Sequence, residues 1–401
     1  MKQLFSILSI AVSFVSCGGR LSPAAHEAGD TLFFKYARMI HVVQYADHTD
    51  VTIDNPWKAG KVLHRYRLVP SAATESQPTG KSPLPQPTSS APLPHPTGEA
   101  APLPASSDGF TLVRVPLQRS VVFTSVHAAL LGQLGASRQV AGVADLKYMK
   151  VPYVQEGVRT GRIADCGDGM SPLVEKIIDA QADAILLSPF ENSGGYGRLE
   201  EIDIPLIECA EYMEESPLAR AEWIRFYGLL YGRQQQADSI FAIVDSNYGL
   251  LKKVATTSRI HPTVLMDKQT GSVWYVPGGR STIGRMLSDA RCNYPYAADA
   301  HSGSLALPFE SILEKCGEAD VWLFRYDSSQ PMTRARLMAE QPGYPQLRPV
   351  KTGRLYGCNV MTSMFYEESP FRPDLLLQDF IQILHPDIPN LLPLRYYQKV
   401  E

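Results

Sequence analysis

Beyond residue 120 the sequence alternates between short apolar runs and longer stretches in which apolar residues recur every three or four positions. The short runs are rich in Val, Ile and Leu and predict buried strands, at residues 121–123, 140–143, 184–187, 205–207, 263–266 and 321–324. The wider spacing predicts helices, at residues 128–134, 173–178, 282–287, 309–315 and 375–384. Strands separated by helices in this order are typical of βαβ units, in which helices cover a mainly parallel sheet.

A longer helical pattern, over residues 215–257, interrupts this alternation. Ser216 followed by Pro217 is a typical helix start, because the hydroxyl can accept from a free amide and the proline needs no donor. Apolar residues then recur at helical spacing on both sides of a break near Gly232. We therefore predict an α/β protein of two βα lobes, joined by a long rigid helix and with a ligand cleft between them. The predicted lobes are residues 108–214 and 258–401.

Strand-like residues and a proline-rich stretch precede the first lobe. Residues 33–70 contain short alternating runs and are predicted to be N-terminal strands of that lobe. Residues 71–107 carry nine prolines. Because proline lacks an amide donor, we expect a solvated, disordered insertion with polyproline-like character. A docking segment for a proline-recognising partner is the alternative.

The first residues have the features of an export signal. A basic start is followed by an apolar run, residues 4–15, which is too short to span a bilayer. Small residues around Cys17 resemble a lipobox, which predicts a signal peptide over residues 1–16, acylation of Cys17 and a lipid-anchored tether over residues 17–32. An ordinary secretory signal is the alternative. Both export the protein, and we expect a periplasmic location with a lipid anchor in a bacterial membrane.

Composition and motifs argue against several classes of function. A net charge of -3 and a pI near 6.3 provide no basic patch for nucleic acid. The sequence has no Gly-x-Ser-x-Gly, no His-Glu-x-x-His and no phosphate loop, so we expect no enzymatic activity. The cysteines after Cys17 lack paired metal spacing, so no zinc site is expected, and buried thiols are the simplest interpretation. A metal-cofactor-dependent enzyme or a structural lipoprotein of similar two-lobed shape is the alternative.

An internal repeat links the two halves. Residues 172–186 and 308–323 both contain a proline, a glutamate in the first helical turn (Glu175 or Glu310), an apolar face and a buried strand. The chain over residues 110–395 resembles the periplasmic binding proteins that deliver ferric siderophores, haem and vitamin B12 to ABC importers. The segments that carry the resemblance are residues 130–135, 140–143, 221–225, 274–279, 372–377 and 383–386.

This resemblance implies a function and partners. It implies a binding protein without an intrinsic cofactor, which captures a ferric siderophore, haem or cobalamin and passes it to the permease and ATPase of an ABC importer. In the family, one glutamate on each lobe engages arginines of the permease, and Glu175 and Glu310 are the counterparts. A carboxylate in a first helical turn is favoured by the helix dipole and can pair with arginine, although such glutamates are also common in ordinary helices. We expect a monomer.

Ligands of open α/β sheets bind beyond the carboxyl ends of the strands, so a ligand is expected at the loops that follow the predicted strands. Aromatic rings and arginines there suit a bulky, ring-bearing or anionic chelate, although some of the rings can equally serve packing. His127 and His301 could coordinate iron or cobalt, but hydrogen bonding is the commoner role of a single loop histidine. The predicted ligand-binding residues are Tyr148, Phe190, Tyr196, Trp274, Tyr275, Arg280, Arg325 and Tyr326.

Overall fold

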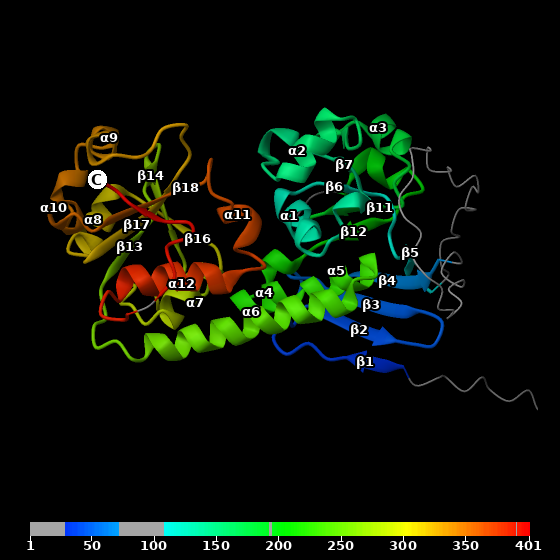
Figure 1. Ribbon diagram of the computed structural model, residues 1–401, viewed down its shortest axis with the longest axis horizontal. Helices are drawn as coiled ribbons and strands as arrows, with labels where there is room; N and C mark the ends of the chain where they lie inside the picture. The colour runs from blue at the N-terminus through cyan, green and yellow to red at the C-terminus, as the bar shows by residue number, and fades with distance from the viewer. Residues whose placement is uncertain (1–28, 72–107, 192–194, 390) are drawn as a thin grey trace, which may run out of the picture.

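The computed structural model describes residues 29–71, 108–191, 195–389 and 391–401. Two α/β lobes lie side by side, a long helix runs along both, and a separate sheet lies beside the first lobe (Figure 1). The predictions for the signal peptide, Cys17 and the proline-rich segment fall outside the described residues, apart from the margins of that segment, and stay predictions. No helix in the described ranges combines the length and the apolar character that a bilayer span requires.

The first lobe is built on a parallel sheet. Its elements are β6 (Ser120–Val122), α1 (Ser125–Gln133), β7 (Val140–Val143), α2 (Pro152–Arg159), β8 (Ala164–Asp165), α3 (Val174–Asp179), β11 (Ala184–Leu187) and β12 (Leu206–Glu208). The strand order is β12-β11-β6-β7-β8. Strands β7 and β11 are buried at every position, which explains their uninterrupted apolar sequence.

The second lobe repeats this plan with a smaller parallel sheet. Its elements are β13 (Val264–Met266), β14 (Gln269–Thr270), β15 (Val273–Pro277), α7 (Thr282–Asp289), β16 (Ser304–Leu307), α8 (Phe309–Cys316), β17 (Val321–Tyr326), α9 (Arg334–Glu340), α10 (Arg348–Thr352), β18 (Leu355–Asn359), α11 (Phe365–Glu368), α12 (Pro373–Leu384) and β19 (Gln398–Lys399). Strands β13, β17 and β18 pair in parallel, and β19 adds an antiparallel edge. The predicted fold, two mainly parallel α/β lobes, is confirmed.

The connector between the lobes consists of three consecutive helices, α4 (Pro217–Glu222), α5 (Ile224–Tyr231) and α6 (Gln234–Ala255). The Ser216 hydroxyl caps α4 by accepting from the amide of Ala219 at 3.0 Å, as the sequence predicts. Gly232 ends α5 at a φ of 62°, a left-handed conformation that glycine adopts without strain. The 22 residues of α6 give a rod of about 33 Å, long enough to lie along both lobes.

Residues 30–70 and 111–115 form a sheet of their own. Its strands are β1 (Asp30–Leu32), β2 (Ile40–Gln44), β3 (Thr49–Asp54), β4 (Val62–Pro70) and β5 (Thr111–Val115), in that order, and only β4 and β5 pair in parallel. The sequence predicts strands here but assigns them to the first lobe. In the structure none of the five described strands pairs with the sheet of the first lobe, although the two sheets contribute to one apolar core.

Two buried carboxylates attach this N-terminal sheet to the connector. Glu222 accepts from the amides of Lys35, Tyr36 and Ala37 at 2.7, 2.7 and 2.9 Å. Glu214 accepts from the amides of Arg38 and Met39 at 2.9 and 3.0 Å, and from the indole of Trp223 at 2.9 Å. The side chain of Lys35 adds an ion pair to Asp245 of α6 at 2.7 Å. Through these bonds the segment between β1 and β2 is fixed to α4, to α6 and to the turn that precedes α4.

Candidate ligand-binding site

The carboxyl ends of the parallel strands in the two lobes face each other. The ammonium group of Lys150, in the loop after β7, donates to the carbonyl of Val360, which follows β18. Helix α11, which also follows β18, packs against α1, which follows β6. All these segments leave the carboxyl ends of parallel strands, the usual location of a ligand in such sheets. The carboxyl edges of the two sheets therefore meet at this junction.

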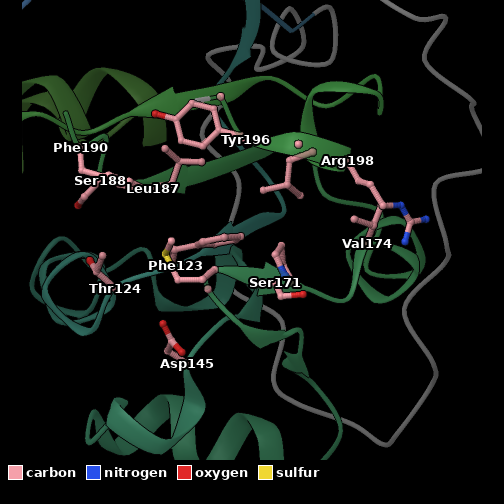
Figure 2. Close-up of a pocket in the computed structure, with 16 residues that line it drawn as sticks. Phe123, Thr124, Asp145, Ser171, Val174, Leu187, Ser188, Phe190, Tyr196 and Arg198 are labelled. Atoms are coloured by element: carbon pink, nitrogen blue, oxygen red, sulfur yellow. The ribbon is translucent and has the colours of Figure 1, made fainter. Parts of the chain in front are cut away.

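A cavity of about 420 Å³ opens at this edge of the first lobe (Figure 2). Phe123 and Thr124, directly after β6, and Leu187 and Ser188, at the end of β11, line it. Its walls are largely apolar with a few polar groups, and its volume lies in the range of small-molecule sites. The position and composition are those of a ligand site.

Two predicted ligand residues, Phe190 and Tyr196, line the cavity. Phe190 is 44% exposed, so its ring is accessible to a ligand. The Tyr196 phenol donates to Glu208 Oε1 at 2.6 Å, and burial together with Glu208 raises the pKa of that phenol. Tyr196 therefore offers a ligand its ring, while its hydroxyl is already engaged.

Asp145 and Arg198 bring opposite charges to the cavity. Asp145 follows β7 at a φ of 52°, and its amide donates to the carbonyl of Gly167 at 2.7 Å. Arg198 lies at the rim, where it pairs with Glu175 at 2.8 Å. Figure 2 shows Asp145 on the opposite side of the cavity from Tyr196 and Arg198. An anionic group of a ligand can pair with Arg198 and a donor group with Asp145.

Met170 is a cavity residue that sequence reasoning missed. It is 77% exposed in the turn between the short strands β9 (Gly167–Asp168) and β10 (Ser171–Pro172), and it lines the cavity. Methionine is flexible and polarizable, so it adapts to ligand shapes. A search limited to aromatic and arginine side chains could not find it, although its place in a glycine-rich turn between two predicted elements is visible in the sequence.

Arg325 is held by an acid that the sequence analysis did not single out. Its guanidinium donates to both carboxylate oxygens of Asp267 at 2.7 and 2.6 Å, and the rings of Phe365 and Tyr366 lie beside it. Burial alone would lower the pKa of Arg325, but Asp267 raises it overall. An anionic ligand must therefore compete with Asp267 for this arginine, which makes Arg325 a weaker anchor than its charge suggests.

Trp274 and Tyr326 lie in the packed interior of the second lobe. Trp274 is completely buried, its indole donates to the carbonyl of Met266 at 2.9 Å, and Trp322 lies against its ring. Tyr326 is 9% exposed, and its hydroxyl accepts from the amide of Met332 at 3.1 Å. The structure corrects the prediction for Trp274, which presents no surface to a ligand. Tyr326 presents very little surface to a ligand.

The remaining predicted residues are exposed but do not line the cavity. Tyr148, after β7, is 64% exposed with the ammonium of Lys147 over its ring. Tyr275 is 48% exposed because strand alternation places it on the face of β15 opposite buried Trp274. Arg280 is exposed in the turn after β15. The structure does not bring these three to the first-lobe cavity, and their contact with a ligand stays a prediction.

The two histidines weighed as metal ligands have other partners. His127 is completely buried, with Nδ1 at 2.7 Å from the Thr124 hydroxyl and Nε2 at 3.1 Å from Glu211. Both of its ring nitrogens are occupied. His301 is exposed and bonds through Nδ1 to Asp299 at 2.9 Å. Among the described residues, no group of three or more His, Cys, Asp or Glu side chains could hold a metal ion.

Most of both lobes falls within the region that matches a known protein family. The sequence pattern of the family described as periplasmic binding protein matches residues 121–360, well over half of the chain. The chain belongs to the periplasmic binding protein family. The matched region begins after β5, so the N-terminal sheet precedes the part that defines a periplasmic binding protein.

Relatives of this periplasmic binding protein include lipoproteins. An uncharacterized lipoprotein of Methanocaldococcus jannaschii is 25% identical over 372 residues, which cover 90% of this chain and 84% of the relative. A second uncharacterized lipoprotein from that organism is 24% identical over 313 residues, covering 75% of this chain and 78% of the relative.

Solved structures share the fold. A periplasmic heme binding protein from Pseudomonas aeruginosa has a TM-score of 0.55 and 15% identity, over 71% of this chain and 98% of that chain. An ABC-type Fe3+-hydroxamate transport protein from Saccharomonospora viridis has a TM-score of 0.51 and 19% identity, over 67% of this chain and 93% of that chain. At these identities the similarity establishes the two-lobed fold alone.

The two glutamates implied in permease docking lie where the sequence predicts, in the first turns of α3 and α8. Both Glu175 and Glu310 are exposed. Glu175 already pairs with Arg198, and that hydrogen bond lowers the pKa of the Glu175 carboxyl. Both carboxylates are accessible to a partner, whose engagement stays a prediction.

Proposed function

We propose that this protein is an extracytoplasmic solute-binding lipoprotein of an ABC importer, and that it binds an iron chelate, namely a siderophore or haem, or cobalamin. The observation that carries the proposal is the cavity at the carboxyl edge of the first-lobe sheet, opposite the same edge of the second lobe. Membership of the periplasmic binding protein family supports it, as does the similarity in fold to a heme binding protein and to an Fe3+-hydroxamate transport protein.

The cavity walls suit a bulky, partly apolar ligand that carries negative charge. Phe123, Met170 and Phe190 provide apolar contact, and Arg198 provides a charge-assisted partner for a carboxylate or catecholate oxygen. Binding removes the accessible surface of these apolar side chains from water, which supplies much of the affinity. The protein's own residues hold the chelate through its organic shell, without a direct bond to the metal.

Delivery requires a membrane location and a permease contact. In this proposal the lipid anchor is attached at Cys17, and the names of the two lipoprotein relatives support an anchor of that kind. The loaded protein then docks on the permease through Glu175 and Glu310, one carboxylate from each lobe.

Direct titration tests the ligand class. Purified protein is titrated with ferric haem, cobalamin and a panel of ferric siderophores, by calorimetry and by quenching of tryptophan fluorescence. One of these compounds is expected to bind with a dissociation constant near or below micromolar, and Phe190→Ala is expected to weaken that binding by about tenfold or more. The matched control is Tyr356→Ala, an aromatic on β18 outside the cavity lining. If the wild-type protein binds none of the compounds, the proposed ligand class is wrong.

A further inference from the structure

The N-terminal sheet precedes the residues that match the family, yet it contacts the first lobe at its edge strand, β12. The outward amide and carbonyl groups of an edge strand need partners. The Tyr66 hydroxyl serves both, because it donates to the carbonyl of Leu206 at 3.0 Å and accepts from the amide of Glu208 at 2.8 Å. Tyr66 is completely buried. One side chain of the N-terminal sheet thus completes the edge of the parallel sheet.

The side chain of Glu208 continues this contact to the ligand cavity. Its Oε1 accepts from the Tyr196 phenol at 2.6 Å, and its Oε2 bonds to His64 Nδ1 at 2.8 Å. The other ring nitrogen of His64 bonds to the Thr111 hydroxyl at 2.8 Å, and its ring stacks on Tyr66 with centroids 4.4 Å apart. Strands β4 and β5 of the N-terminal sheet therefore hold His64, His64 holds Glu208, and Glu208 holds a residue of the cavity wall.

The Tyr196 amide donates to Glu200 at 2.7 Å, which holds the backbone but does not set the direction of the ring. Gly195 and Gly197 flank Tyr196 at φ values of 96° and 54°, conformations that glycine adopts readily. The phenol bond to Glu208, together with packing against the apolar cluster of the first lobe, sets the direction of the ring. Glu208 itself is suited to this role because its side chain is only 10% exposed and both of its oxygens are engaged.

We propose that His64 and Glu208 are positioning residues of the ligand site, so that the N-terminal sheet forms part of the binding machinery. They hold the Tyr196 ring in its place in the cavity wall before the ligand arrives. The ligand then binds without the entropy loss of ordering that ring. The inference rests on the proposed function of the cavity.

The affinity for ferric haem, the probe, tests the positioning. Glu208→Ala, His64→Leu and Tyr196→Phe are each expected to raise the dissociation constant about three- to tenfold, the size of one lost hydrogen bond. Glu208→Gln keeps an oxygen acceptor for the phenol and is expected to bind within about twofold of wild type. The double variant Glu208→Ala/Tyr196→Phe is expected to bind as weakly as either single variant, because both remove the same bond.

Val42→Ala is the matched control. Val42 is completely buried on β2, which β3 separates from β4, so its truncation destabilises the N-terminal sheet without removing any bond between His64, Glu208 and Tyr196. We expect a lower melting temperature with unchanged haem affinity. If affinity instead follows melting temperature across all variants, the role of His64 and Glu208 is only structural and the proposal fails.

A second measurement needs no ligand. The Tyr196 amide donates to Glu200 at 2.7 Å, so its hydrogen exchange reports how well this segment is held. Glu208→Ala and His64→Leu are expected to accelerate that exchange about tenfold, and Glu208→Gln much less. Unchanged exchange overturns the positioning role. If wild-type protein binds no haem, cobalamin or siderophore, the proposed function fails, and the exchange result still decides whether His64 and Glu208 hold Tyr196.

Discussion

Arg198 lines the ligand cavity and, at the same time, pairs with Glu175 on the surface at 2.8 Å. Glu175 is the first-lobe carboxylate proposed to engage the permease. Both side chains are about two-thirds exposed, at 66% and 67%, so water and salt screen the pair strongly. An anionic ligand that pairs with Arg198 weakens the ion pair between Arg198 and Glu175. The same guanidinium therefore contacts both the ligand cavity and the carboxylate proposed to dock on the permease.

Arg198→Ala is expected to weaken binding of an anionic chelate about three- to tenfold, because it removes the cavity's charge-assisted donor. The melting temperature should change little, since the pair is exposed. Raising the salt concentration should lower the ligand affinity of the wild-type protein towards that of the variant. Glu175→Gln is the control, because it frees Arg198 and leaves the affinity intact or higher. Equal losses in both variants would contradict a direct contact between Arg198 and the ligand.

Reversing both docking carboxylates, by Glu175→Lys together with Glu310→Lys, is expected to abolish uptake in cells while the purified protein keeps its ligand affinity. The reason is that a lysine on each lobe repels the permease arginines that the glutamates are proposed to meet. Asp179→Lys with Glu314→Lys is the matched control, since these exposed acids lie on the same two helices, α3 and α8. The docking role of Glu175 and Glu310 is ruled out if uptake survives their reversal, or if uptake fails equally in the Asp179 and Glu314 control.

The lobes and their main strands were predictable because their signal is local. The run at residues 184–187 coincides with β11, and the serine-proline pair before α4 caps that helix as expected. The pairing of the N-terminal strands could not be predicted, for the opposite reason. Strand alternation at residues 49–53 reveals β3 but carries no information on its pairing partners, which are set by contacts far along the chain.

The candidate site shows the same limit. Phe190 and Tyr196 were found because rings in a glycine-rich loop are easily noticed in a sequence. Trp274 has similar local features, yet it is buried by Trp322 and Tyr344, whose proximity only the fold creates. Glu208 could not be recognised as a site residue, since its role depends on partners in three separate segments, at His64, Tyr66 and Tyr196.

Glu222→Ala is expected to lower the free energy of unfolding by about 3 kcal/mol. The carboxylate accepts from three consecutive amides, those of Lys35, Tyr36 and Ala37, and its loss leaves buried donors without an acceptor. Denaturant unfolding followed by circular dichroism measures this. Asp238→Ala, on the exposed face of α6, is the control and should have little effect. A loss no larger than that of the control would show that Glu222 does not anchor the N-terminal sheet.

The cysteines are expected to be inert in the folded protein. The five in the described residues, Cys166, Cys209, Cys292, Cys316 and Cys358, are all free thiols. Burial raises the pKa of Cys166 and Cys316 to about 11 and that of Cys292 and Cys358 to about 12.

At pH 8, a thiol with a pKa of about 11 is roughly one-thousandth thiolate, and the thiolate is the reactive form. A soluble form that begins at residue 29 should therefore show no fast-reacting thiol with Ellman's reagent at pH 8. After unfolding in guanidinium chloride it should show five. The reaction of the native protein should become faster only as the pH rises towards these raised values. Rapid labelling at pH 8 would contradict the burial of these side chains.

Two glycines should respond in opposite ways to alanine. Gly249 lies inside α6 with no atom within 4 Å of an added Cβ, so Gly249→Ala is expected to raise the free energy of unfolding by about 0.5 to 1 kcal/mol through helix propensity. At Gly279 the added carbon would lie 2.3 Å from the carbonyl of Ala297 and 2.6 Å from that of Asp299. Backbone carbonyls cannot move aside cheaply, so Gly279→Ala should lower stability by about 3 kcal/mol. Denaturant unfolding of both variants checks this, and a tolerated alanine at Gly279 would contradict the tight turn after β15.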